Sequence, residues 1–106
     1  MWPVDFIEEK RDGKEQSASR IKKFIEDYTQ GRVADYQAAA WLMAVYLKGM
    51  NEGETAALTA AMRDSGEVVD LSAIDGVTVD KHSTGGIADT TTLIVAPLVA
   101  AAAVKV

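Results

Sequence analysis

The chain has 106 residues and no cysteine; 48% of the residues are hydrophobic, 25% are charged, and the formal net charge is −5. This is the composition of an ordinary globular domain, and it argues against disorder, a disulfide scaffold and a thiolate metal site. Because the acidic balance repels polyanions, no nucleic-acid partner is expected, and a single histidine disfavours a transition-metal cluster.

Neither end of the chain carries a recognisable targeting or membrane signal. The first ten residues lack the basic stretch, long apolar core and cleavage site of a signal peptide. The most apolar stretch, residues 93–104, is shorter than the roughly 18–20 residues that span a bilayer. It therefore predicts a buried core helix, and we expect a cytoplasmic protein with no membrane partner.

Four short helices are predicted in the first two-thirds of the chain. Pro3 suits the first turn of a helix that stops at Gly13, with the Glu-Glu-Lys-Arg run at 8–11 facing water. A second helix runs from a Ser17 cap towards residue 30. Its apolar residues recur at spacings of three and four, which marks one buried stripe.

The third and fourth helices are predicted from their caps. Residues 36–48 follow a cap at Asp35 and are apolar nearly all round, so we expect this helix to be buried on several sides. Asn51, with Glu54 three residues later, forms a capping-box pattern for a helix through residue 63.

The periodicity changes after Gly66. Residues 66–76 are an irregular, acidic connector, 77–81 alternate as a strand does, and 89–103 form an apolar helix before the start of a second strand at 104–106. A strand–loop–helix–strand unit belongs to a parallel sheet, which needs several strands and cover on both faces. We therefore expect either the opening piece of a longer polypeptide or a helix covered by something outside the chain.

Residues 81–92, KHSTGGIADTTT, have the composition of an anion-binding loop. They gather the only histidine, a lysine, five hydroxyls and two adjacent glycines between the predicted strand and helix. Backbone N–H groups of such a loop, the following helix dipole and the Lys81 charge all favour a phosphate. Ser-Thr-Gly-Gly is also common turn chemistry, and the spacing matches neither a P-loop nor a dinucleotide fingerprint. The position after a strand and before a helix favours phosphate.

Several segments closely resemble the start of pyrimidine-nucleoside phosphorylases, the thymidine phosphorylase family. They are VDFIEEKRDGK at 4–14, DYQ at 35–37, KGM at 48–50, SGE at 65–67, DLS at 70–72 and, above all, VDKHSTGG at 79–86. Because members of that family are several times longer, the resemblance implies an N-terminal piece.

The implied fold class is α/β overall, with an N-terminal all-helical domain followed by the first strand–loop–helix of a larger, here truncated, mixed α/β phosphate-binding domain. The resemblance places the helical domain, with the dimer contacts and the base side of the cleft, at 1–65. A hinge connector follows at 66–76, and the α/β domain begins at 77–106.

In that family, phosphate attacks the anomeric carbon of a pyrimidine nucleoside and gives free base and (deoxy)ribose 1-phosphate. The resemblance implies that His82 is catalytic, because it would face the pyrimidine carbonyl and stabilise the departing base. It would act as an acid or as a neutral donor, and the sequence leaves both open. The implied phosphate-binding residues are Lys81, His82, Ser83 and Thr92.

The resemblance also implies a potassium ion held by main-chain oxygens at Ala88 and Thr90. Ala88 stands where the family usually has glycine. If φ is positive there, alanine costs about 1 kcal/mol and disturbs the ion site. A homodimer through the helical domain is implied as well. We expect the 106 residues alone to be inactive, because they lack most of the family's base-binding residues.

Two alternatives stay open. An anthranilate-phosphoribosyltransferase-like protein shares the architecture and a Gly-Gly phosphate loop, but it binds phosphoribosyl diphosphate with magnesium. The Lys81-His82-Ser83 sequence before the glycines argues against it. The other alternative is a non-catalytic helical association module.

Overall fold

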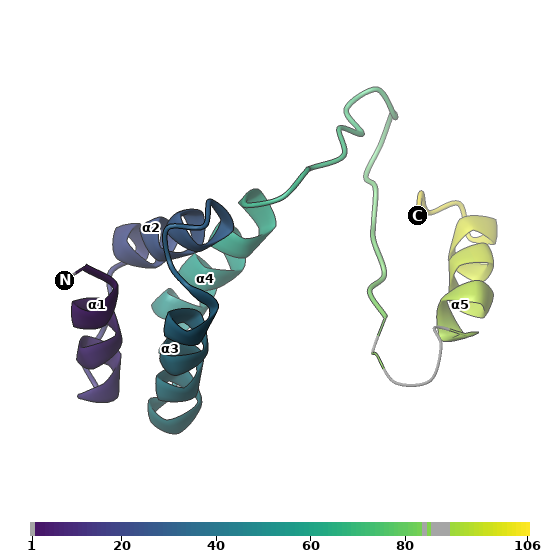
Figure 1. The fold of residues 1–106 in the computed structure, drawn as a ribbon. Helices are drawn as coiled ribbons and strands as arrows, with labels where there is room; N and C mark the ends of the chain where they lie inside the picture. Colours follow the sequence, from purple (N-terminus) through teal and green to yellow (C-terminus); the bar gives the residue numbers. More distant parts are fainter. Residues whose placement is uncertain (1, 84, 86–89) are drawn as a thin grey trace. The chain divides into compact units, whose positions relative to one another are not determined.

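The computed structural model describes residues 2–83, 85 and 90–106, which form five helices. These are α1 (Trp2–Arg11), α2 (Ala18–Thr29), α3 (Asp35–Lys48), α4 (Glu52–Asp64) and α5 (Thr90–Ala101) (Figure 1). The chain divides into two compact units, a helical unit, Met1–Val68, and a C-terminal unit, Val69–Val106. Across the described ranges, no helix combines the length and the apolar character that crossing a membrane requires.

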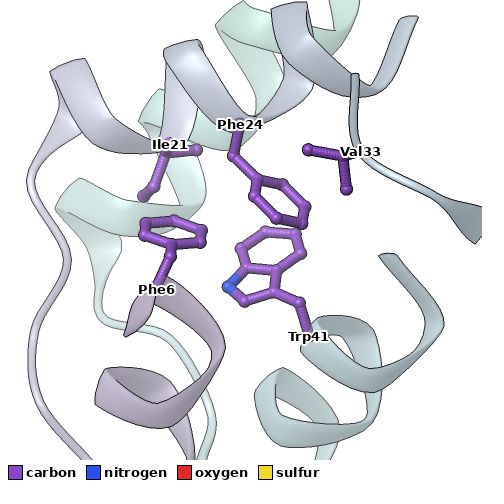
Figure 2. Close-up of a cluster of buried hydrophobic side chains, with 5 residues drawn as sticks. All are labelled: Phe6, Ile21, Phe24, Val33 and Trp41. Carbon is purple, nitrogen blue, oxygen red and sulfur yellow. The ribbon is translucent and has the colours of Figure 1, made fainter. Parts of the chain in front are cut away.

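The core of the helical unit joins two packed helix pairs. Helix α1 packs on α3, and α2 packs on α4. The ring centroids of Phe6 and Phe24 are 4.9 Å apart, and that of Trp41 lies 5.7 and 5.0 Å from them (Figure 2). Ile21 and Val33 complete the cluster, in which no residue is more than 2% exposed. Aromatic pairs at these distances attract one another beyond the effect of area burial.

The predicted capping box of α4 is confirmed. Asn51 Oδ1 accepts a hydrogen bond from the Glu54 N–H at 2.8 Å, and Glu54 Oε2 accepts one from the Asn51 N–H at 3.0 Å. Just before it, Gly49 ends α3 with φ of 75°, a left-handed conformation that glycine adopts without strain. The chain thus turns from α3 into α4 within a few residues.

Helix α2 begins after its predicted cap, whereas the cap of α3 differs from the sequence prediction. Ser17 is the N-cap of α2, but its side chain makes no capping hydrogen bond, and its Oγ lies 3.2 Å from that of Ser19. Asp35 is not the cap of α3. Ala34 holds that position, its N–H donating to the Gln37 side chain at 3.1 Å, whereas Asp35 accepts from the Tyr28 hydroxyl. A glutamine three residues into a helix can satisfy the N-cap N–H without any side chain at the cap.

The expectation that α3 is buried on several sides is wrong for the described chain. Only Ala38, Trp41 and Ala44 of this helix are buried. Its exposed apolar face, which we call the α3 face, contains Leu42, Met43, Tyr46 and Leu47, which are 55–83% exposed. Helix α3 has one well-packed side because only one side meets the other helices of the unit.

The C-terminal unit contains less regular structure than predicted. Residues 77–81 do not form a strand; one isolated parallel bridge links Thr78 to Lys105, with the Val79 N–H donating to the Lys105 carbonyl at 2.8 Å. Helix α5 ends two residues earlier than predicted, and none of its residues is buried. The prediction of a buried core helix therefore fails in this chain. The single bridge between Thr78 and Lys105 does not form a sheet on which α5 could pack.

Candidate phosphate site

The structure brings together two of the predicted phosphate-binding residues. The Lys81 ammonium donates a hydrogen bond to Thr92 Oγ1 at 2.6 Å, across eleven positions of the chain. Both side chains are half-buried. An ammonium and a hydroxyl are both hydrogen-bond donors to oxyanions, so this contact places two donor groups within reach of one anion.

The other two predicted residues, His82 and Ser83, directly follow Lys81 in sequence and are exposed. Ser83 Oγ accepts a hydrogen bond from the Gly85 N–H at 3.1 Å, and Gly85 has φ of 80°. His82 Nδ1 lies 2.8 Å from the Ser83 carbonyl oxygen. Because a carbonyl only accepts, Nδ1 is the protonated nitrogen in this contact. The hydrogen bonds therefore hold the serine and the histidine to their own loop rather than to Lys81 or Thr92.

Helix α5 supplies the rest of the described site. It begins at Thr90, with Thr91 and Thr92 in its first turn, where the helix dipole is positive. Thr84, Gly86, Ile87, Ala88 and Asp89 lie outside the described residues. The described part is therefore a lysine, a threonine and a helix start, all suited to a negative charge.

The predicted potassium site is half outside the described residues. Ala88 is not described, so only the main-chain oxygen of Thr90 remains. Cation sites of this kind need several oxygens to replace the hydration shell, and one carbonyl does not form one. Within the described ranges, no three His, Cys, Asp or Glu side chains gather as metal ligands. The potassium ion stays a prediction.

Sequence reasoning missed a buried charge in the helical unit. The run 8–11 was expected to face water. Glu8 does, and it pairs with Arg11 at 3.2 Å, but Lys10 is only 3% exposed and bonds to Glu54. The i, i+3 spacing reveals the first pair. No local pattern reveals the second, whose partners lie 44 residues apart.

A second buried carboxylate ties α1 to α2. Asp27, 3% exposed, accepts hydrogen bonds from Lys23 at 2.6 Å, Arg32 at 2.9 Å and the Trp2 indole N–H at 3.0 Å. These donors, Lys23 and Arg32 foremost, lower the pKa of Asp27 to about 2. The carboxylate is therefore ionised over the whole neutral range.

Comparison with known proteins places the helical unit in a family. Residues 4–66 match the sequence pattern of a family described as the glycosyl transferase family, helical bundle domain. The chain belongs to this glycosyl transferase family. The match covers α1 to α4 almost completely, so the bundle formed by the helical unit is the family's helical domain.

Within the glycosyl transferase family, the chain is similar over all 106 residues to curated pyrimidine-nucleoside phosphorylases. It is 58% identical to the enzyme of Staphylococcus haemolyticus, and 55% identical to those of Staphylococcus epidermidis and Geobacillus stearothermophilus. The chain spans 24% of the length of each of these relatives. The predicted resemblance is thereby confirmed at the level of the family.

Proposed function

We propose that this chain is the N-terminal part of an enzyme that phosphorolyses pyrimidine (deoxy)nucleosides. The observation that carries the proposal is the 58% identity, over every residue of the chain, to a pyrimidine-nucleoside phosphorylase. In the proposed organisation, 1–65 form the helical side of a cleft, 66–76 a hinge, and 77–106 the opening of a larger α/β domain. The parallel bridge between Thr78 and Lys105 and the lack of buried residues in α5 support the last assignment.

In the proposed reaction, a phosphate oxygen bonds to the anomeric carbon while the bond from that carbon to the pyrimidine nitrogen breaks. The electron pair leaves with the base, which takes up the proton brought by hydrogen phosphate. Negative charge develops on the departing base, and a donor at its carbonyl lowers the barrier. Phosphate must meanwhile be held close to the sugar, which lowers the entropy cost of attack.

Lys81 and Thr92 are proposed to hold the phosphate. Their 2.6 Å contact supports a joint role, since both groups then act on the same oxyanion at the start of α5. Ser83 is proposed as a third hydroxyl ligand, which requires its Oγ to donate to phosphate while accepting from Gly85. A potassium ion is proposed to support the loop through Ala88 and Thr90, and no step depends on it.

His82 is proposed to donate to the base carbonyl. Because Nδ1 donates to the Ser83 carbonyl, Nε2 carries a hydrogen only when the ring is cationic. With that contact kept, the donor is therefore the imidazolium rather than the neutral ring.

The exposed α3 face supports a homodimer through the helical unit. Large apolar side chains gathered on one helix surface mark an association site, and Tyr46 and Leu47 are 83% and 69% exposed. We expect Tyr46→Glu to weaken self-association in sedimentation runs at several concentrations. Thr59→Glu, at an exposed position of α4, is the matched control and leaves self-association unchanged. Equal sedimentation of both variants and the parent would contradict the dimer proposal.

The test of the reaction is a chimera in which these 106 residues replace the matching segment of the S. haemolyticus enzyme. We expect the chimera to convert thymidine or uridine with phosphate, and the 106 residues alone to give no turnover. Lys81→Met should mainly raise the KM for phosphate, and His82→Ala should lower kcat by about 10²–10⁴-fold, the usual contribution of a positioned acid or base.

The control variant for the chimera is Lys105→Met, which removes a lysine side chain of the same unit. The bridge from Lys105 to Thr78 is made by the backbone and is therefore kept. It should retain the activity of the parent chimera. A folded chimera that turns over phosphoribosyl diphosphate but no nucleoside would favour the anthranilate-phosphoribosyltransferase-like alternative. Full activity of His82→Ala would remove the catalytic role of that residue.

A further inference from the structure

The helical unit contains a buried polar network centred on Glu54. Its Oε1 accepts hydrogen bonds from Lys10 Nζ at 2.9 Å and the Gln16 N–H at 2.8 Å, and its Oε2 accepts from Lys10 Nζ and the Asn51 N–H, both at 3.0 Å. Lys10, Gln16 and Glu54 are 3%, 2% and 4% exposed. The carboxylate is therefore fully engaged out of water.

Gln16 extends the network to the aromatic core. Its Oε1 accepts the Trp41 indole N–H at 2.9 Å, and its Nε2 donates to the Phe6 carbonyl at 2.6 Å. Both ends of one amide are thus fixed by residues of different helices. Among the described residues that are not exposed, no buried side-chain nitrogen or oxygen lacks a hydrogen-bond partner.

The polar network, defined as Lys10, Gln16, Trp41 and Glu54, crosses the boundary between the two helix pairs. Lys10 and Trp41 belong to the α1/α3 pair, Glu54 belongs to the α2/α4 pair, and Gln16 lies in the segment between α1 and α2. Other polar links across this boundary are Trp2 to Asp27, Arg20 to Glu9 and Tyr28 to Asp35, and each includes at least one side chain that is not buried.

The aromatic cluster and the polar network constrain the structure differently. Stacked rings and apolar burial depend weakly on direction, so they stabilise contact between the pairs without selecting one register. Hydrogen bonds to a buried carboxylate lose their energy within small displacements, and a buried ion pair adds little net stability, because both charges lose hydration. We propose that the polar network fixes the register of α1/α3 against α2/α4, while the aromatic cluster supplies the stability.

This proposal rests on contacts inside the helical unit and not on the proposed reaction. The test uses the 106-residue chain with Lys10→Met and Glu54→Leu combined, which removes both charges and keeps apolar volume. The two tryptophans report by their indole N–H signals in NMR spectra: Trp41 donates within the network, and Trp2 donates to Asp27 outside it. Urea unfolding is measured on the same samples.

We expect the double variant to unfold cooperatively at a somewhat lower urea midpoint, because the Gln16 and Asn51 N–H groups lose their acceptor, while both indole signals broaden or split. Multiplicity at Trp2 is decisive, because a merely local loss of the Gln16 contact would alter Trp41 alone. The control, Arg63→Met with Asp64→Leu, removes an exposed ion pair of α4 and should leave both signals single.

Two results would overturn the proposal. One is a single sharp Trp2 signal in the double variant, which would mean that the register survives without the network. The other is loss of the cooperative transition, which would mean that the network supplies stability. If the double variant does not fold, Gln16→Leu, which keeps the ion pair between Lys10 and Glu54, provides a second test of the proposal. Split signals with a cooperative unfolding transition in this variant support the register role, and single signals contradict it.

Discussion

The helical unit and the C-terminal unit place similar apolar residues in different surroundings. In the helical unit, Phe6, Phe24 and Trp41 come from three helices and exclude water from one another. In the C-terminal unit, Leu93, Ile94 and Leu98 of α5 are 65–76% exposed, although α5 is the most apolar helix of the chain. Apolar composition produces a core only where several elements converge, so the folding energy of this chain resides in the helical unit.

The largest expected effect comes from Trp41→Ala. It removes a ring that is 1% exposed and touches two other rings, so we expect a loss of about 3–5 kcal/mol in the free energy of unfolding. Urea titration followed by circular dichroism measures it. Tyr36→Ala, on the same helix but 76% exposed and outside the α3 face, is the matched control and should change stability by less than about 0.5 kcal/mol. Similar losses in both variants would mean that burial of the ring does not set the cost.

Acid should weaken the helical unit through Asp27. Its folded pKa of about 2 lies below the ordinary value of 3.8, so its stabilisation is complete above that ordinary value. It is lost as the pH falls from about 4 to about 2. Asp27→Asn should flatten this part of a stability-against-pH curve, whereas Asp12→Asn, whose exposed carboxylate also has a lowered pKa, should flatten it much less. Parallel curves for parent and Asp27→Asn would contradict the assignment.

Helix caps provide a finer comparison inside the helical unit. Asn51→Ala removes a side chain that accepts the Glu54 N–H, so a loss of about 1 kcal/mol is expected. Ser17→Ala should cost distinctly less, because Ser17 makes no capping hydrogen bond. Thermal melts of both variants at one protein concentration test the difference, and equal losses would argue that cap identity, rather than the observed bond, sets the energy.

The smallest effect is expected in the C-terminal unit. Leu98→Ala, at a side chain that is 65% exposed, should change the free energy of unfolding by less than about 0.5 kcal/mol. A loss approaching that of Trp41→Ala, in the same urea titration, would break the contrast between the two units. It would mean that α5 is packed against other apolar surface in solution.

Local features of the fold were predictable from the sequence, and distant ones were not. The Asn51–Glu54 box and the Glu8–Arg11 pair each span three residues, so their chemistry is visible in the spacing. Lys10 and Glu54 are 44 residues apart, and only the packed helices bring them together. Burial of α3 was overestimated, because an apolar helix does not reveal how many neighbours it has.

The candidate site was predictable to a different degree. The loop composition at 81–92 indicates an anion, and the pairing of Lys81 with Thr92 follows from a loop whose ends meet at the start of α5. The contacts of His82 with the Ser83 carbonyl and of Gly85 with the Ser83 hydroxyl depend on backbone angles, which residue spacing does not predict. The roles of these residues came from the family resemblance and remain predictions.

The Lys81–Thr92 hydrogen bond also has a consequence for ligand affinity. The bond holds the ammonium and the hydroxyl 2.6 Å apart before any anion arrives, so part of the side-chain entropy of ordering these two groups is already lost. An anion that binds both groups then has less ordering to impose, so more of its contact energy is expressed as affinity. The two side chains that would hold the anion are thus the ones that hold each other in position.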